Sequence, residues 1–151
     1  DDAPRLLTDL LIGALHQYTA FETVPSQEAP AVRDALQSAA GFQQSPLTTL
    51  ARTGRMMQAD LVIQGYVYRF EDRIGKDYAA ESPASVAFDL HLIDCREQRV
   101  VWSGHFDQTQ QALLEDLGYI GTFFRRGGRW VTAEEMAREA MDALFEGFSQ
   151  P

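Results

Sequence analysis

The chain has 151 residues, 45% of them hydrophobic, and carries 13 Lys and Arg against 22 Asp and Glu, a formal net charge of −9. This length and composition predict one domain, residues 1–151, that buries a core without disulfides or a structural metal. The acidic balance argues against non-specific binding to nucleic acid or anionic lipid, because the field of the molecule repels phosphate groups.

The single cysteine, Cys95, precludes an internal disulfide, and its place in a predicted turn indicates a tolerated thiol near the surface. No stretch approaches the roughly 18 consecutive apolar residues that a membrane-spanning helix needs, and the first residues lack the organisation of a signal peptide. We expect any targeting segment to lie upstream of Asp1 and to have been removed.

The first elements in chain order are helices. Apolar residues recur at three- and four-residue steps near residues 4–19 and 29–40, and Ser45-Pro46 opens a third helix over residues 46–58. Between the first two, residues 21–25 form a short candidate strand that ends at Pro25. Because such a first helix usually follows a strand, we expect a first strand before Asp1.

Three runs then predict an antiparallel meander over residues about 60–70, 85–94 and 99–107. The first is rich in Val, Ile, Tyr and Phe on both faces, which predicts an inner strand with Gly65 at a bulge or close approach. The second alternates apolar and polar residues, as in a half-buried strand, and joins the third by a short turn. Residues 71–84 predict a long connection.

The last third of the chain is less regular. Residues 112–118 predict either a short helix or an apolar turn, and residues 119–124 a loop with aromatic side chains. Thr132 and Glu135 fit a capping box that opens a final helix near residues 132–147. The sequence therefore predicts an α/β (α+β) fold with two layers, in which helices pack on a mixed sheet that contains the meander.

Positive charge is concentrated in one place, and a pair of glycines there allows backbone N–H groups to turn toward an anion. The run is Arg125-Arg126-Gly127-Gly128-Arg129-Trp130. We weigh two interpretations: a site for a small anionic ligand or glycan, using Arg125, Arg126, Arg129 and Trp130 with Phe123 or Tyr119, and a surface turn with Trp130 packed at the mouth of the last helix. The surface turn is favoured.

Two histidines and two aspartates lie on the predicted hairpin. If their side chains shared a face, His91, His105, Asp89 and Asp107 would provide ligands for a metal-dependent hydrolase. Both strands need their apolar faces for the core, so the same four residues also fit the solvated half of the alternation, and we favour that interpretation. No metal or other cofactor is predicted.

The sequence contains no pattern typical of a catalytic nucleophile or of paired catalytic carboxylates. Ser103 has no nucleophile elbow around it, and Cys95 has only a turn. The adjacent carboxylates Glu115 and Asp116, and likewise Glu134 and Glu135, point apart on a helix and so face no shared substrate. The sequence therefore predicts no catalytic residues and a protein that is not an enzyme.

The order of several short motifs resembles a group of bacterial cell-envelope proteins. The first helix contains Leu7-Thr8-Asp9-Leu10-Leu11, and Ala59-Asp60 followed by Gly65 opens the central strand before the meander. This order, over roughly residues 5–106, resembles the small α/β domains of curli-secretion-channel lipoproteins and the amino-terminal domain of the Tol-Pal propeller protein. The carboxy-terminal stretch looks closer to uncharacterised lipoproteins.

This resemblance implies a non-enzymatic periplasmic domain of an outer-membrane lipoprotein, with a role in protein binding or envelope assembly. It implies other cell-envelope proteins as partners, or self-association through a sheet edge, and membrane attachment only through an upstream lipid anchor. Two features depart from the family pattern: the hairpin turn is Asp94-Cys95-Arg96-Glu97-Gln98, and the family's first strand is absent before Asp1. Pore formation is not implied, since the transmembrane hairpins are missing.

Overall fold

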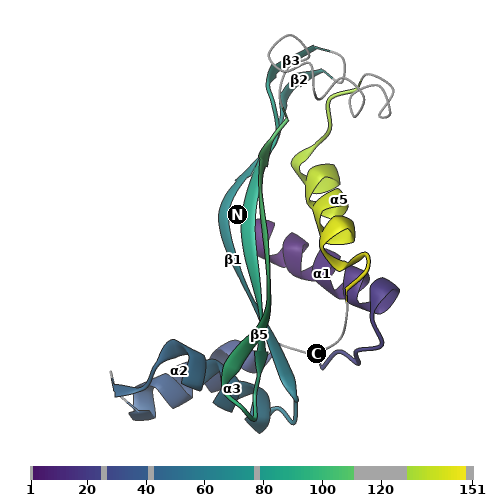
Figure 1. The fold of residues 1–151 in the computed structure, drawn as a ribbon. Helices are drawn as coiled ribbons and strands as arrows, with labels where there is room; N and C mark the ends of the chain where they lie inside the picture. Colours follow the sequence, from purple (N-terminus) through teal and green to yellow (C-terminus); the bar gives the residue numbers. More distant parts are fainter. Residues whose placement is uncertain (1, 25–26, 41–42, 77–78, 111–128, 149–151) are drawn as a thin grey trace. The chain divides into compact units, whose positions relative to one another are not determined.

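A computed structural model describes residues 2–24, 27–40, 43–76, 79–110 and 129–148 of the chain (Figure 1). The described helices are α1 (Ala3–Tyr18), α2 (Ala29–Ala40), α3 (Pro46–Met56) and α5 (Ala133–Phe145). The described strands are β1 (Leu61–Glu71), β2 (Ile74–Lys76), β3 (Ala79–Ser82), β4 (Ser85–Asp94) and β5 (Arg99–Thr109). None of these helices combines the length and apolar character needed to cross a bilayer.

The α+β class is confirmed. Strands β1, β4 and β5 form a three-stranded antiparallel sheet in the order β1-β4-β5, and β2 and β3 form a separate antiparallel pair. Helix α2 has the predicted bounds, and the other helices end within a few residues of theirs. The parallel pairing that a mixed sheet requires does not occur among the described residues.

Two predictions about the strands are wrong, in opposite directions. Strand β1, predicted as an inner strand, lies at one end of the order β1-β4-β5, and β4, predicted as half-buried, lies in the middle. Consecutive residues of β4 are buried, with Val86 0%, Ala87 2% and Phe88 1% exposed. The small Ala87 fits between layers where the alternation suggested a solvated residue, so both faces of β4 are covered.

Two further local predictions need correction. Residues 71–84, predicted as a long connection, contain the β2–β3 pair, in which Gly75 takes a φ of 109° that favours glycine. Residues 21–24 form no strand, although their composition suits one. Pro25 and residues 112–118 and 119–124 lie outside the described residues.

The chain divides into two compact units. The first contains residues 1–20, 67–88 and 105–149, and in it α1 and α5 pack against each other (Figure 1). In the same unit the tilted rings of Phe88 and Phe106 lie against each other, with centroids 5.6 Å apart. Among the described residues of this unit, the buried apolar side chains are Ala3, Leu7, Leu10, Ala14, Leu15, Ala84, Val86, Ala87, Phe88, Val131, Ala133, Met136, Ala137, Ala140, Met141 and Phe145.

The second unit contains residues 21–66, 89–104 and 150–151, and in it α2 packs against α3. Helix α3 begins at the cap Ser45, whose Oγ accepts a hydrogen bond of 3.1 Å from the Thr48 N–H. Near its end, α3 comes so close to the β4–β5 turn that a Cβ added to Gly54 would lie 2.5 Å from Cys95 Sγ and 2.5 Å from Val62 Cγ2.

That close approach overturns the prediction for Cys95. The residue lies in the expected turn, but its side chain is only 1% exposed because Gly54 has no side chain to hold the helix away. The Cys95 N–H also donates a hydrogen bond of 3.0 Å to the Asp60 carbonyl oxygen. Burial raises the pKa of the Cys95 thiol, with the nearby Asp94 carboxylate acting in the same direction, so the thiol is a poor nucleophile.

Candidate functional sites

The predicted basic cluster is described only in part. Arg125 and Arg126 lie outside the described residues, as do Phe123 and Tyr119. Arg129 and Trp130 are described, and both are half-buried beside the start of α5. Arg129 is thus the one arginine of the cluster among the described residues, and the use of the cluster by a ligand stays a prediction.

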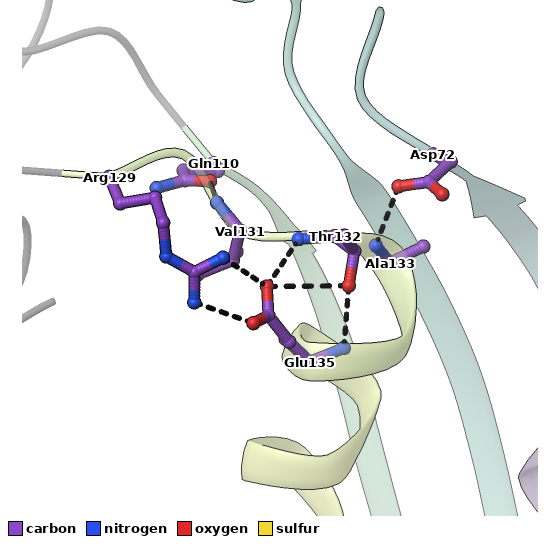
Figure 2. Close-up of polar contacts among 7 residues, drawn as sticks. All are labelled: Asp72, Gln110, Arg129, Val131, Thr132, Ala133 and Glu135. Carbon is purple, nitrogen blue, oxygen red and sulfur yellow. Dashed lines mark hydrogen bonds and ion pairs between the residues drawn. The ribbon is translucent and has the colours of Figure 1, made fainter. Parts of the chain in front are cut away.

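Arg129 is engaged by the chain's own carboxylate. Its Nη2 lies 2.6 Å from Glu135 Oε1 and its Nη1 lies 3.2 Å from Glu135 Oε2, a two-point ion pair (Figure 2). The Arg129 hydrogen bonds, followed by the bond from the Thr132 backbone, hold the pKa of Glu135 below its ordinary value. Glu135 thus stays ionised at neutral pH and balances the charge of Arg129.

The same carboxylate completes the predicted capping box of α5. The Thr132 N–H donates a hydrogen bond of 2.8 Å to Glu135 Oε2, and the Glu135 N–H donates one of 3.1 Å to Thr132 Oγ1. A second carboxylate arrives from beyond the end of β1, where Asp72 Oδ1 accepts a hydrogen bond of 3.0 Å from the Ala133 N–H (Figure 2). The first turn of α5 is therefore held by two acidic side chains.

Gln110 holds the approach to this helix. The residue is buried, at 8% exposed. Its side-chain Oε1 accepts a hydrogen bond of 2.8 Å from the Val131 N–H, and its backbone N–H donates one of 3.0 Å to the Ala84 carbonyl oxygen. Residues 110 and 131 are thus fixed beside each other (Figure 2). An anion binding here would have to compete with Glu135 and Asp72, so the arrangement works as a structural junction.

A second candidate is the stretch 67–71 of β1, which we call the β1 edge segment. Its leading residues are apolar and exposed, with Val67 at 37% and Tyr68 at 63% exposed, and Glu71 at its end is also exposed. Among the described residues, β1 has β4 as its one hydrogen-bonded neighbour in the sheet. The backbone groups on the other side of β1 pair with no strand among the residues that the structure describes, and such an edge is a place where another chain can pair.

Arg69 fixes this segment to the rest of the sheet. Its Nε donates to Ser85 Oγ on β4, and its Nη2 donates to Asp107 Oδ1 on β5. Ser85 Oγ in turn shares a hydrogen bond of 2.6 Å with Thr109 Oγ1. The guanidinium group thus links β1 to both other strands.

The residues proposed for a metal site have other contacts. His91 Nδ1 lies 3.0 Å from Ser103 Oγ, and the His91 ring meets Tyr66 edge-on at a centroid distance of 5.9 Å. Asp107 is paired with Arg69. In the part of the chain that the structure describes, no three His, Cys, Asp or Glu side chains lie together in a way that could hold a metal ion.

The carboxylates considered for catalysis are placed as follows. Glu135 forms the capping box, and Glu134 pairs with Arg138 one turn later at 3.0 Å. Glu115 and Asp116 lie outside the described residues. The capping pattern indicated Glu135 from sequence, but the roles of Asp72, Gln110 and Arg69 depend on partners between 16 and 61 positions away, and no local pattern could have identified them.

No protein-family model and no curated protein matches the chain. Among solved structures, it is similar to the PelC dodecamer from Paraburkholderia phytofirmans, with 18% sequence identity, a TM-score of 0.46, and coverage of 89% of this chain and 82% of PelC. A variant of that dodecamer gives 19% identity, a TM-score of 0.42, and coverage of 84% and 78%. With identities of 18% and 19% and TM-scores of 0.46 and 0.42, these two structures assign no function to this chain.

Proposed function

We propose that this chain is a non-enzymatic periplasmic domain of an outer-membrane lipoprotein, and that it binds other cell-envelope proteins through the β1 edge segment. The observation that carries the binding proposal is the exposed pair Val67 and Tyr68 on a strand with one described neighbour in the sheet. An extended chain that pairs with such an edge gains main-chain hydrogen bonds and covers exposed apolar side chains.

The other edge strand of the sheet is less suited to this role. In the first unit, β5 exposes polar side chains, His105, Asp107, Gln108 and Thr109. Charged and polar residues on an edge strand discourage pairing with another chain. The β1 edge segment instead begins with an aromatic and a β-branched residue, the types that form favourable cross-strand pairs.

The Arg69 network supports the same proposal. An edge strand that frays presents no fixed row of N–H and C=O groups, and a partner then has to order it at a cost in conformational entropy. Because Arg69 joins β1 to Ser85 and Asp107, the segment is held in register before a partner arrives. Such preorganisation favours binding.

The binding proposal is tested by capture of proteins from detergent-solubilised envelopes. We expect Tyr68→Lys to remove most of the captured protein, because the lysine places a charge where the partner strand would pack. The matched control is Val100→Lys, which changes a residue of β5 that is 42% exposed and should leave capture intact. Equal capture by the wild-type chain and Tyr68→Lys would contradict the proposal.

The location is supported by the motif order that the chain shares with envelope lipoprotein domains. We expect the full-length gene product in the outer-membrane fraction, with an amino-terminal lipid detected by intact mass spectrometry. An unmodified product in the cytosol would overturn the lipoprotein part of the proposal.

Binding of a small anionic ligand or glycan by Arg125, Arg126, Arg129 and Trp130 stays a second proposal. Since Arg129 is paired with Glu135, we assign the principal role in any such binding to Arg125 and Arg126. The double change of Arg125 and Arg126 to Ala should then abolish thermal shifts by anionic glycans or phosphate, whereas Arg129→Ala should lower the melting temperature without ligand. Unchanged shifts in the double variant would remove the proposal.

A further inference from the structure

The charge around the β1 edge segment indicates which kind of chain it accepts. Arg69, the cation within the segment, is paired with Asp107. Glu71 at the end of the segment is exposed, and it forms no ion pair with any residue that the structure describes. The neighbouring Asp72 uses one carboxylate oxygen for the N–H groups of Arg73 and Ala133 and is also exposed.

The apolar start of the segment sets a second requirement. Successive residues of a strand point to opposite faces of the sheet, so Val67 and Tyr68 present apolar surface on both faces. A strand laid beside them covers both when it carries aromatic or β-branched residues at successive positions. The segment is as long as an ordinary strand, so a short extended peptide is enough to fill it.

A second copy of the chain fits these requirements poorly at this edge. The chain carries a net charge of −9, so two copies repel each other on approach. Their Glu71 side chains would also find no basic partner on the opposing β1 edge segment, because Arg69 is committed to Asp107. Lys76 is the nearest exposed cation after the segment, and it lies on β2.

On the basis of the function proposed above, we propose that the partner strand is a basic extended segment: aromatic or β-branched in its middle, with Lys or Arg at the end that lies opposite Glu71. Main-chain pairing provides the binding, and the acidic end of the β1 edge segment selects the sequence and the direction of the incoming strand.

The experiment is a titration of the full chain with three synthetic peptides. The first alternates Val, Tyr and Thr and has Lys at both ends, the second has Glu at both ends, and the third is the Lys peptide with alternate backbone amides methylated. We expect the Lys peptide to bind about fivefold tighter than the Glu peptide at low salt. The methylated peptide should not bind, because it lacks the main-chain donors.

A variant locates the effect. Glu71→Gln should reduce the preference for the Lys peptide while leaving binding of the Glu peptide the same or tighter, and Glu81→Gln, an exposed acid on β3, should leave the preference unchanged. Tyr68→Lys should weaken both peptides. These results would support the basic partner strand and place it on the β1 edge segment.

Three outcomes would overturn the inference. Equal binding of the Lys and Glu peptides, with no binding of the methylated one, removes the basic partner and leaves edge pairing intact. Binding of no peptide, together with unchanged envelope capture by Tyr68→Lys, removes the proposed function as well. A free chain that sediments as an oligomer and becomes monomeric in Tyr68→Lys shows that the occupant is a second copy.

Discussion

Strands β1 and β4 have nearly the same length and a similar share of apolar residues, yet the fold uses them in opposite ways. In β4, Val86, Phe88 and Leu92 are each at most 1% exposed, whereas in β1 Tyr66 is 47% and Tyr68 63% exposed. The difference follows from position in the sheet: β4 is paired on both sides and β1 on one among the described residues. Apolar composition alone does not determine which strand is central.

The two strands differ in the size of the side chains that alternate with their large aliphatic and phenylalanine residues. In β4, small Ala87 and Ser85 are buried beside the large residues, so another layer can approach closely. On one face β1 instead carries Tyr66 and Tyr68, which are 47% and 63% exposed. Their hydroxyl groups suit a surface that is solvated in the free protein and covered in a complex. An apolar edge strand is a hazard for an isolated protein, and it is also a surface that a partner strand can cover.

The largest expected effect comes from truncating one aromatic residue on each strand. Phe88→Ala should lower the free energy of unfolding by about 3–5 kcal/mol, because it leaves a cavity and removes the contact with Phe106. Tyr68→Ala should change it by about 0.5 kcal/mol or less. Urea unfolding measures both, and Phe88→Leu provides a milder change if Phe88→Ala does not fold. Similar losses at the two positions would contradict the assignment of β1 to an edge.

Substitutions at two glycines compare a crowded position on α3, Gly54, with an uncrowded one on α1, Gly13. Gly54→Ala should cost about 1–3 kcal/mol, because the new methyl group would collide with Cys95 and Val62. Gly13→Ala on α1 meets nothing within 4 Å and should instead stabilise the chain by about 0.5–1 kcal/mol. Chemical denaturation of both variants checks the signs. A stabilising Gly54→Ala would show that α3 does not lie against β1 as described.

The two adjacent acids at the end of β1 should differ as well. Asp72→Ala removes the carboxylate that accepts from the Ala133 N–H and should cost about 1 kcal/mol. Glu71→Ala removes an exposed carboxylate and should stay within about 0.5 kcal/mol of the wild type. Thermal unfolding of the two variants separates the residue that serves the fold from the residue that we assign to binding. A larger loss in Glu71→Ala would reverse that assignment.

The smallest effect is a pH dependence at the start of α5. The folded-state pKa of Glu135 is depressed, chiefly by hydrogen bonds from Arg129. The unfolded chain therefore binds a proton more readily, so this group stabilises the fold above the ordinary carboxyl pKa and loses its contribution as the pH falls toward the depressed value. Glu135→Gln should flatten the loss of stability in that acid range, and Glu139→Gln serves as the control. Parallel profiles for Glu135→Gln and the wild type would contradict this account.

The sequence predicts those features that depend on local periodicity. The helix bounds follow from residues three and four positions apart, and the capping box follows from the spacing of Thr132 and Glu135. The three strands of the meander follow from period-two runs and a short turn. These interactions join residues that are close in the chain, so their patterns can be read without knowing the fold.

The remaining features depend on which distant segments meet. The burial of Cys95 requires Gly54, far along the chain, and the order β1-β4-β5 is not encoded in the composition of any one strand. One arginine of the predicted basic cluster, Arg129, forms an ion pair with Glu135 of the same chain. Sequence located the cluster but did not show that one of its arginines supports a helix.

The measurement that tests the central claim most directly is residue-resolved hydrogen exchange of the backbone amides of β1 and β4. If β1 is an open edge, amides of the β1 edge segment should alternate between fast and slow exchange, whereas β4 amides should all exchange slowly. Addition of the Lys peptide should then slow the fast set. Uniform protection along β1 in the free chain would show that this edge is already covered, and the binding proposal would fail.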